Sequence, residues 1–579
     1  MKRWIGKRCN ADFSKIASRY NITEIFAEVL VKRGLYTWEA MDKYLFPDID
    51  MMYAPELMKG IKQAGELIID YIKNGKKIRV IGDYDVDGVM SSYILVKAIT
   101  MLDGSADYRI PHRVNDGYGI RSYMVDEAYN DDIDMIVTCD NGISAVDAAL
   151  RAKELGIKYI ITDHHEVPSE NDIFIIPDAD VIVDPKQPEC HYPFSQLCGA
   201  GVAYKVISYI FNQYNDKNYI EELLPFVAIA TICDVVPLSD ENRIIVNNGL
   251  KMLSDKSIMK NIGMNALLNE LHLSEKVSSG DIGFKIGPCI NAAGRLSDAA
   301  MGMELLLEEN KDRAVELACK LVRLNEKRKD MTAEAEAEAD KQIEKINIQK
   351  TPVLVLYLKN CHESVAGIVA GRVREKYYRP VYILTKTKTG LKGSGRSITD
   401  YHMQSELVKC QKLLTEFGGH AMAAGFSLPE ENLINFRETL NKQCPLKPEE
   451  MLEKLNFDKE VKLSDVSYEL VTQLKWLEPF GEANEKAVFA KRGVIVESVY
   501  MCGRENQIAR LKIKDEGKVF NAVDFNAEKC IGRAVCERYG ESTWETMKNG
   551  QCLKSIDILY VPDINKMYGN IQFKIIDCR

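Results

Sequence analysis

The chain has 579 residues, of which 46% are hydrophobic and 28% are charged. This composition is typical of folded globular proteins, and the length exceeds the ~250 to 300 residues at which a single hydrophobic core stops growing, so we expect several domains. The formal net charge of −9 excludes a protein that coats nucleic acid through bulk positive charge, although it is compatible with a local basic groove.

The sequence contains 15 cysteines but no Cys-x-x-Cys pair. This pattern indicates neither a complete disulfide framework nor a zinc ribbon, and reduced thiols are typical of the cytosol. The basic N-terminus is followed by no apolar segment of signal-peptide length, and no later run reaches the ~18 apolar residues of a membrane span. We therefore predict a cytoplasmic protein that does not enter a membrane.

Short apolar runs alternate with helical patterns in the first third of the chain. Strands that alternate with helices at this spacing predict a parallel sheet with right-handed crossovers. The predicted strands span residues 78–82, 134–138, 158–162 and 181–184, and the predicted helices span residues 89–101 and 145–155.

Residues 304–350 contain neither glycine nor proline, which predicts a helical segment. One continuous helix would extend about 70 Å at ~1.5 Å per residue and would connect two globular bodies. Two helices joined by a helical turn are an equally good interpretation of the same residues.

A second α/β pattern follows this helical segment, and a β pattern ends the chain. The α/β pattern consists of a strand at residues 353–358, a helix at 365–378, a strand at 381–384, glycine clusters at 393–397 and 418–420, and an acidic helical stretch at 448–455. Alternating apolar residues then predict five strands, which is enough for a small barrel. These strands span residues 494–502, 507–514, 518–525, 555–561 and 570–577.

Three aspartates, Asp83, Asp85 and Asp87, follow the first predicted strand at alternate positions. In a loop at the carboxyl end of a parallel strand they would converge where open α/β sheets bind ligands. Because clustered carboxylates repel one another, the arrangement favours a site for a hard cation such as Mg²⁺ or Mn²⁺. An EF-hand calcium loop is the alternative, but its twelfth position is Ile94 rather than glutamate, and a strand precedes it.

Further acidic and imidazole side chains follow other predicted strands. Asp140 ends the second run, and Asp163, His164 and His165 end the third, so we expect them to meet the first cluster at one sheet edge. A lone aspartate after a strand is more often a helix cap or a turn residue, but imidazole with several carboxylates is typical of Mn²⁺ or Zn²⁺ hydrolases. Asp234 lies in an apolar run and needs a partner, for which the metal cluster is the obvious candidate.

These motifs, in this order, resemble those of the DHH phosphoesterase superfamily, with Asp163-His164-His165 as the signature triplet. Within the superfamily, nearly the whole chain is similar to the RecJ family of single-stranded-DNA-specific 5′-to-3′ exonucleases. The similar motifs of the first half are Trp4 and residues 32–34, 82–88, 110–113, 117–119, 197–202, 234–238 and 291–296. Those of the second half are His362 and residues 367–370, 393–397, 417–420, 423–426 and 478–481.

The resemblance implies an α/β fold with three bodies. A parallel-sheet DHH domain and a second α/β, DHH-associated domain are joined by a long helix, and a C-terminal OB-like β-barrel follows. We accordingly expect a DHH catalytic domain with an N-terminal extension at residues 1–302 and a connecting helix at 303–350. A DHH-associated substrate-binding domain at 351–455 and an OB-fold nucleic-acid-binding domain at 456–579 complete the chain.

The resemblance also implies a phosphodiesterase site with two Mn²⁺ or Mg²⁺ ions, which would activate a water and stabilise the attacking and leaving oxygens. The expected metal ligands are Asp85, Asp87, Asp140, His164 and Asp234. Supporting or catalytic roles are expected for Asp83, Asp163 and His165. Arg295 and His362 would contact the backbone near the scissile phosphate, Arg113, Ser394 and Arg396 would bind the 5′-terminal phosphate, and Gly418, Gly419 and His420 would belong to the same substrate-binding region.

The residue types suit substrate binding, although each has an ordinary structural interpretation. Residues 393–396 offer backbone N–H groups and a guanidinium that suit phosphate, but a glycine-rich turn with an arginine is more often a solvated loop. His112, His362 and His420, taken singly, are more often structural. In the predicted barrel, aromatics among cations suit stacking of unpaired bases, while half or more of the rings should be core. These residues are Tyr500, Phe520, Phe525, Tyr560, Tyr568, Arg492, Arg510, Lys512 and Lys514.

The expected function is therefore metal-dependent hydrolysis of single-stranded DNA from the 5′ end, in DNA repair and recombination. The expected partners are single-stranded DNA and, beyond it, a single-strand-binding protein and a helicase. One alternative is a phosphodiesterase of short oligonucleotides or cyclic dinucleotides, whose relatives lack the C-terminal barrel. Another is a non-catalytic relative that binds single strands, but such a protein would normally have lost some of the acidic ligands, and all of them are present here.

Overall fold

The computed structural model describes residues 2–113, 115–214, 218–273, 275–388, 390–550 and 553–579, without the side chains of residues 218–220. The chain divides into two units. One is Pro47–Met451, and the other combines Met1–Phe46 with Leu452–Arg579. Among the described residues, no helix combines the length and the apolar character that crossing a membrane requires.

The first sheet of the unit Pro47–Met451 is parallel throughout, as predicted. Its strands lie in the order β3-β2-β4-β5-β8. Their bounds are Lys77–Ile81 for β2, Ser105–Arg109 for β3, Met135–Cys139 for β4, Lys158–Thr162 for β5 and Val181–Val183 for β8. Because successive side chains point to opposite faces, Val137 joins the core on one side and Ile136 the core on the other, formed with α6 (Ser122–Asn130) and α7 (Val146–Leu155).

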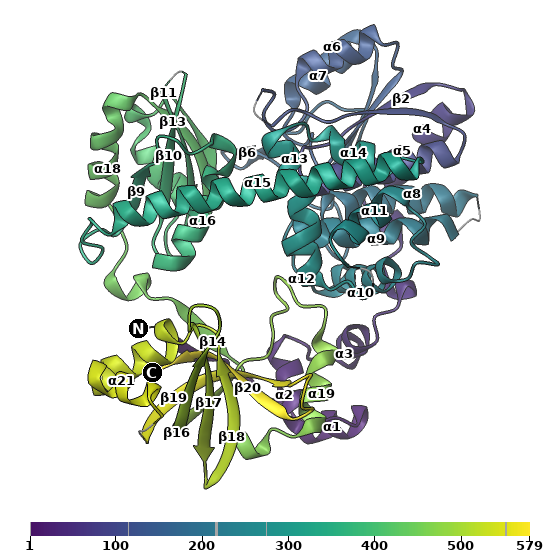
Figure 1. Ribbon diagram of the computed structural model, residues 1–579. Coiled ribbons are helices and arrows are strands. Elements are labelled where there is room, and N and C mark those ends of the chain that lie inside the picture. The colour runs from purple at the N-terminus through teal and green to yellow at the C-terminus, as the bar shows by residue number, and fades with distance from the viewer. Residues whose placement is uncertain (1, 114, 215–217, 274, 389, 551–552) are drawn as a thin grey trace. The chain divides into compact units, whose positions relative to one another are not determined.

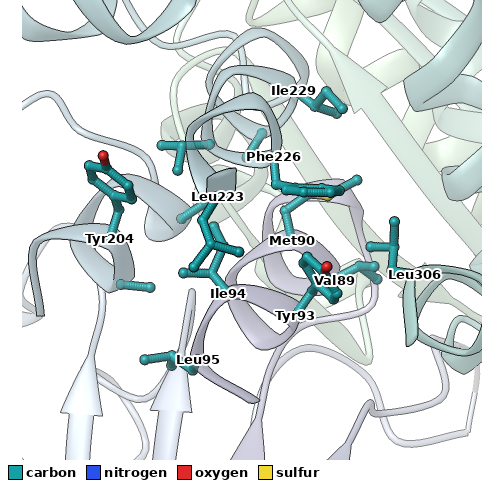
Figure 2. Close-up of a cluster of buried hydrophobic side chains, with 14 of the residues drawn as sticks. Val89, Met90, Tyr93, Ile94, Leu95, Tyr204, Leu223, Phe226, Ile229 and Leu306 are labelled. Carbon is teal, nitrogen blue, oxygen red and sulfur yellow. The ribbon is translucent and has the colours of Figure 1, made fainter. Parts of the chain in front are cut away.

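Helix α5 (Val86–Met101) follows the aspartate loop and is buried on nearly every side. Figure 2 shows its residues Val89, Met90, Tyr93 and Ile94 among side chains from α9 (Asn218–Cys233), including Phe226. The rings of Tyr93 and Phe226 have centroids 4.6 Å apart. Burial all around fixes the helix, and with it the loop that precedes it.

Most of the predicted connector is one long helix, and only its first residues belong to a separate, shorter helix. Helix α14 (Ala300–Leu307) ends before α15 (Lys311–Ile343), whose first turn is capped by Asn310 Oδ1 accepting from Arg313 N. Helix α15 has 33 residues and is therefore about 50 Å long at ~1.5 Å per residue. It packs against α11 (Ile262–Glu270) and α13 (Gly287–Leu296) at one end and against α16 (Glu363–Tyr377) at the other (Figure 1).

The second sheet follows α15 and has the order β12-β13-β11-β10-β9. Its strands are β9 (Leu354–Tyr357), β10 (Val381–Thr387), β11 (Gly390–Arg396), β12 (Glu416–Gly419) and β13 (Ala423–Leu428). The first glycine cluster is thus not a solvated loop but an inner strand. A Cβ on Gly393 would lie 2.2 Å from the Phe426 ring, and one on Gly395 would lie 2.3 Å from Met403 Sδ, so these glycines make room for core side chains.

The second unit contains the predicted β-barrel. Its strands have the order β15-β16-β17-β18-β20-β19, and pairing of β16 with β19 closes it. The bounds are Lys459–Glu460 for β15, Phe489–Cys502 for β16, Ile508–Asp515 for β17, Lys518–Asp524 for β18, Lys554–Ile564 for β19 and Ile571–Cys578 for β20. The acidic helix expected at 448–455 is wrong, because only a short 3-10 turn spans Pro448–Met451 and strand β14 (Lys454–Phe457) follows.

The N-terminal segment packs with the barrel unit, whereas we expected it to extend the first domain. Strand β1 (Arg3–Gly6) pairs with β14, and α2 (Glu24–Lys32) contacts α19 (Tyr468–Leu474). The Thr23 amide and hydroxyl both donate to Gln473 Oε1, at 2.9 and 2.8 Å. The apolar face of α2 therefore completes the core of the barrel unit, so the expected domain 1–302 does not include its first 46 residues in the structure.

Candidate metal centre and substrate pocket

The carboxyl ends of β2, β4 and β5 bring the predicted acidic and imidazole residues to one edge of the first sheet. The loop after β2 contains Asp83 and Asp85, and Asp87 lies in the first turn of α5. Asp140 follows β4, and residues 163–165 follow β5. Asp234 reaches the same place from the end of helix α9. Asp234 lies in an apolar run of the sequence, and the structure shows that residues 230–233 of this run end α9, with Asp234 directly after the helix.

His164 lies at the centre of this cluster. Its Nε2 atom is 3.1 Å from Asp140 Oδ1, 3.7 Å from Asp87 Oδ2 and 3.7 Å from Asp234 Oδ2. One imidazole nitrogen therefore faces carboxylates from three separate segments of the chain. The predicted convergence of these residues is present in the structure.

Two groups of potential ligands adjoin at Asp140 and His164. In one, Asp87, His164 and Asp234 have ligand atoms within 4.8 Å of one another, and in the other Asp83, Asp85 and Asp140 do so. Asp140, His164 and His165 form a third such group. A mixture of carboxylate oxygens and imidazole nitrogen suits Mn²⁺ and Mg²⁺, so these residues could hold metal ions.

The N-terminus of helix α8 (Gly199–Gln213) orients Asp87. The Asp87 carboxylate accepts two hydrogen bonds, at 2.6 Å from the Gly199 amide and at 2.8 Å from the Ala200 amide. A Cβ on Gly199 would lie 2.6 Å from the Cβ of Asp140, so only glycine allows α8 to approach the cluster this closely. Gly199 belongs to the motif at residues 197–202, and its role in this approach depends on contacts between distant segments, which the local sequence does not indicate.

Asp163 orients its neighbours rather than facing the cluster. Its carboxylate accepts hydrogen bonds from the Ile143 amide at 2.9 Å and the His164 amide at 2.7 Å, and it lies 2.7 Å from His165 Nδ1. Although burial alone would lower the pKa of His165, the hydrogen bond to Asp163 raises it to about 9. Tyr118, which the sequence analysis did not assign individually, donates its hydroxyl to the Asp140 carbonyl at 3.0 Å.

The buried carboxylates repel one another because they carry like charges in a small volume. Burial raises the pKa of Asp83, Asp87 and Asp140, and neighbouring carboxylates raise each further. Burial likewise raises the pKa of Asp234 to about 8. A divalent cation would remove this penalty because it compensates several carboxylates at once, and the donor set therefore fits such an ion.

A group of arginines flanks the cluster on the Asp83 side. Arg113, Arg295, Ser394 and Arg396 line a cavity of about 390 Å³ together with one side of α16, which contributes residues from Glu363 to Glu375. Within the described residues, no carboxylate forms an ion pair with these three arginines, and burial followed by repulsion from Arg113 lowers the pKa of Arg295 to about 9. Uncompensated guanidinium groups that share one cavity form a site suited to an anion such as phosphate.

The remaining predicted substrate residues are divided. Gly419 lines a cavity that also contains Arg113, Ser394 and Arg396. His362 caps helix α16, with its Nδ1 accepting from the Ser364 amide at 3.3 Å, and it lines a separate groove of about 1160 Å³. Gly418 belongs to the edge strand β12, and the His420 amide donates to the Ala423 carbonyl in the turn that follows. Arg328 on α15 was not among the predicted substrate residues. Its positive charge, after burial and Arg113, is the next contribution that lowers the pKa of Arg295.

The barrel separates its predicted aromatic residues into two classes. Tyr560 is fully buried, and the ring of Phe520 packs on Phe573 with centroids 5.7 Å apart. Tyr500 and Phe525 are exposed, and Tyr500 lies opposite Arg510 in the β16–β17 register. Arg510 and Lys512 are exposed on the same face of β17, so this face offers a ring and cations to solvent.

Comparison with known proteins covers most of the chain. Three family models match it in succession: the DHH family N-terminal domain at residues 77–231, the DHHA1 domain at 350–445 and the RecJ OB domain at 457–577. The chain is 31% identical over 541 residues to the single-stranded-DNA-specific exonuclease RecJ of Escherichia coli, which covers 90% of both proteins. The chain belongs to the RecJ family.

Other RecJ proteins extend this likeness. The identity to RecJ of Bacillus subtilis is 34% over 537 residues, which are 90% of this chain but 66% of that protein's length. A crystal structure of RecJ from Thermus thermophilus in complex with Mn²⁺ matches with a TM-score of 0.81 at 24% identity, covering 100% of this chain and 79% of that one. The predicted family and fold class, with DHH and DHH-associated domains and an OB-like barrel, are therefore confirmed.

Proposed function

We propose that this chain is a metal-dependent exonuclease that hydrolyses single-stranded DNA from its 5′ end in DNA repair and recombination. The observation that supports this proposal most strongly is the position of His164 Nε2 among three carboxylates at the carboxyl edge of the parallel sheet. Membership in the RecJ family gives the reaction class, and the arginine-lined cavity gives a reason for recognition of a strand end.

Two Mn²⁺ or Mg²⁺ ions are part of the proposal. The residues that would hold them are Asp85, Asp87, Asp140, His164 and Asp234. Asp83 belongs to the same group of potential ligands as Asp85 and Asp140. Bound divalent ions lower the pKa of a water and stabilise both the attacking and the leaving oxygen of an in-line displacement. The chain then needs no nucleophile of its own, and its task is to orient ligands and substrate.

The described contacts suit that task. Asp163 fixes the His164 backbone and the His165 ring, so that both imidazoles keep their orientation toward the cluster. Arg295 lines the arginine cavity and is held there by a 2.6 Å hydrogen bond from its Nη1 to the Ser364 carbonyl. We assign Arg295 and His362 to the DNA backbone near the scissile phosphate, and Arg113, Ser394 and Arg396 to the 5′-terminal phosphate.

The barrel and the second α/β domain would bind the rest of the strand. Residues 351–455 supply Ser394, Arg396 and the glycines Gly418 and Gly419 with His420, and residues 456–579 supply Tyr500, Arg510 and Lys512 for bases and backbone. The proposal further includes a cytoplasmic location, and single-strand-binding protein and helicase as sources of the single strand. The 14 described cysteines are all free, which fits a reducing compartment.

Release of nucleotides from 5′-labelled DNA tests the proposal. With Mn²⁺ or Mg²⁺, the protein should release the label from a long single strand, leave duplex DNA intact, and stop when the metal is chelated. A protein that cleaves only short oligonucleotides or cyclic dinucleotides would instead be a small-substrate phosphodiesterase. A protein that binds the strand without cleaving it would be a non-catalytic relative.

A further inference from the structure

Lys186 lies beside the metal cluster, on a turn that is fixed by hydrogen bonds. The proposed mechanism assigns this lysine no role. The turn follows β8, whose neighbour β5 ends in the Asp163-His164-His165 triplet, and the Asp163 amide donates to the Val183 carbonyl at 3.0 Å. The Lys186 amide donates to Asp184 Oδ1 at 2.7 Å, and the side chain of Asp184 is fully buried. The backbone of Lys186 is therefore fixed at the same sheet edge as the ligands.

The side chain of Lys186 is held at the rim of the cluster. Its Nζ atom lies 3.1 Å from Oε1 of Glu166, the residue directly after His165, and only 19% of the Lys186 side chain is exposed. Glu166 is 82% exposed in its side chain, and an ion pair with so exposed a partner is weak because water screens it. The positive charge of Lys186 is thus available to another anion.

Lys186 and the arginine cavity lie on different sides of the metal cluster. The first sheet has the strand order β3-β2-β4-β5-β8, and its strands are parallel. Arg113 follows β3 and Lys186 follows β8, whereas Asp83, Asp140 and His164 follow the strands between them, β2, β4 and β5. Cations therefore flank the cluster on its β3 side and on its β8 side, as a strand with phosphates on both sides of the reacting one requires.

We propose that Lys186 binds the phosphate on the 3′ side of the scissile phosphate and so positions the strand over the metal ions. This inference rests on the proposed function, in which the arginine cavity takes the 5′-terminal phosphate and the first internucleotide linkage is cleaved. The second linkage then falls on the β8 side of the cluster, where Lys186 lies.

Lys158 is a matched control for Lys186. It begins β5 at the opposite edge of the same sheet and forms a 2.6 Å ion pair with Asp180. The variants K186Q and K158Q each remove one positive charge, whereas K186R keeps it. Thermal unfolding of all three variants would show that their folds are equivalent.

The experiment measures kcat and KM of these variants on 5′-phosphorylated single-stranded DNA. The strands contain either normal linkages or one neutral methylphosphonate, placed at the second or the third linkage. We expect K186Q to raise KM about tenfold and to reduce the slope of log(kcat/KM) against log[salt] by about 1, the change for one lost phosphate contact. K158Q and K186R should stay within about twofold of the wild type. The methylphosphonate at the second linkage should raise KM for the wild type but have no further effect on K186Q.

The outcomes separate this inference from the function on which it rests. If the wild type degrades the unmodified strand but K186Q has an unchanged KM and salt slope, the inference fails alone. It also fails if the methylphosphonate at the second linkage raises the KM of K186Q as much as that of the wild type. A purely structural role of Lys186 would give that result. A wild type that leaves the unmodified strand uncut would overturn the proposed function and the inference with it.

Discussion

The Nε2 atom of His164 lies 3.1 Å from Oδ1 of Asp140, although the two residues follow different strands, β5 and β4. Both residues are buried, and the sheet connects their strands directly. Asp140 belongs to the ligand group of Asp83 and Asp85, and it contacts His164 of the other ligand group. Loss of Asp140 should therefore disturb both groups.

The variants D140N and H164A should lose nearly all cleavage. Loss of metal stabilisation costs several kcal/mol, which corresponds to about 10²- to 10⁴-fold in kcat. D140N should not reduce the thermal stability of the metal-free protein, because it removes one of several mutually repelling buried carboxylates. The control is D134N. Asp134 directly precedes the first residue of β4 and forms an ion pair with Lys76. Normal turnover by D140N or H164A would show that the site is misplaced.

Replacing Asp163 by asparagine should weaken the site without removing a ligand. The uncharged side chain cannot accept all the hydrogen bonds that now fix Ile143, His164 and His165. Loss of such an orienting partner typically reduces metal affinity or activity about 10- to 100-fold. Titration of Mn²⁺ into wild type and D163N checks this, and equal affinities with equal kcat would contradict the orienting role.

Metal-free protein should become less stable as the pH rises. The folded-state pKa of Asp234 is raised to about 8 by burial, while an unfolded aspartate titrates near 4. The folded state therefore binds the proton more tightly, so its stability falls between about pH 4 and pH 8. Added Mn²⁺ should reverse this trend because the ligands bind metal only when deprotonated. Melting temperatures across this range, with chelator and with Mn²⁺, check the prediction, and parallel curves would contradict it.

Truncations should follow the two structural units rather than the linear order of the chain. A fragment of residues 1–457 would leave α2 without α19 and the barrel core, and the exposed apolar surface should make it aggregate. A fragment of residues 47–451 removes both parts and should fold, with cleavage of short oligonucleotides preserved and affinity for long strands reduced. Size-exclusion chromatography and nuclease assays compare them, and a soluble, folded 1–457 fragment would argue against the assignment.

Local motifs made the metal cluster predictable. Asp83, Asp140 and Asp163 each follow a short apolar strand, and parallel strands bring their carboxyl ends to one edge, so the sequence order already implied the encounter. The cost of burying an unpaired charge indicated that Asp234 joins the cluster, and in the structure its carboxylate lies 3.7 Å from His164 Nε2, directly after α9.

Contacts between distant segments could not be predicted in this way. The Gly199 amide meets Asp87 across 112 positions, and Thr23 meets Gln473 across 450, and no local pattern encodes either pair. The glycines at residues 393–396 left a solvated loop as the ordinary alternative to a phosphate site, whereas in the structure they make room for Phe426 and Met403 inside a sheet. Lys186 gave no signal because a single lysine after a strand is ordinarily a surface charge.

Anomalous diffraction from crystals of the full chain grown with Mn²⁺ tests the central claim most directly. We predict two peaks about 3.5 to 4 Å apart, both within coordination distance of residues from the set Asp85, Asp87, Asp140, His164 and Asp234. A single peak, or peaks that lie away from His164 and Asp140, would contradict a two-metal centre at this edge of the sheet.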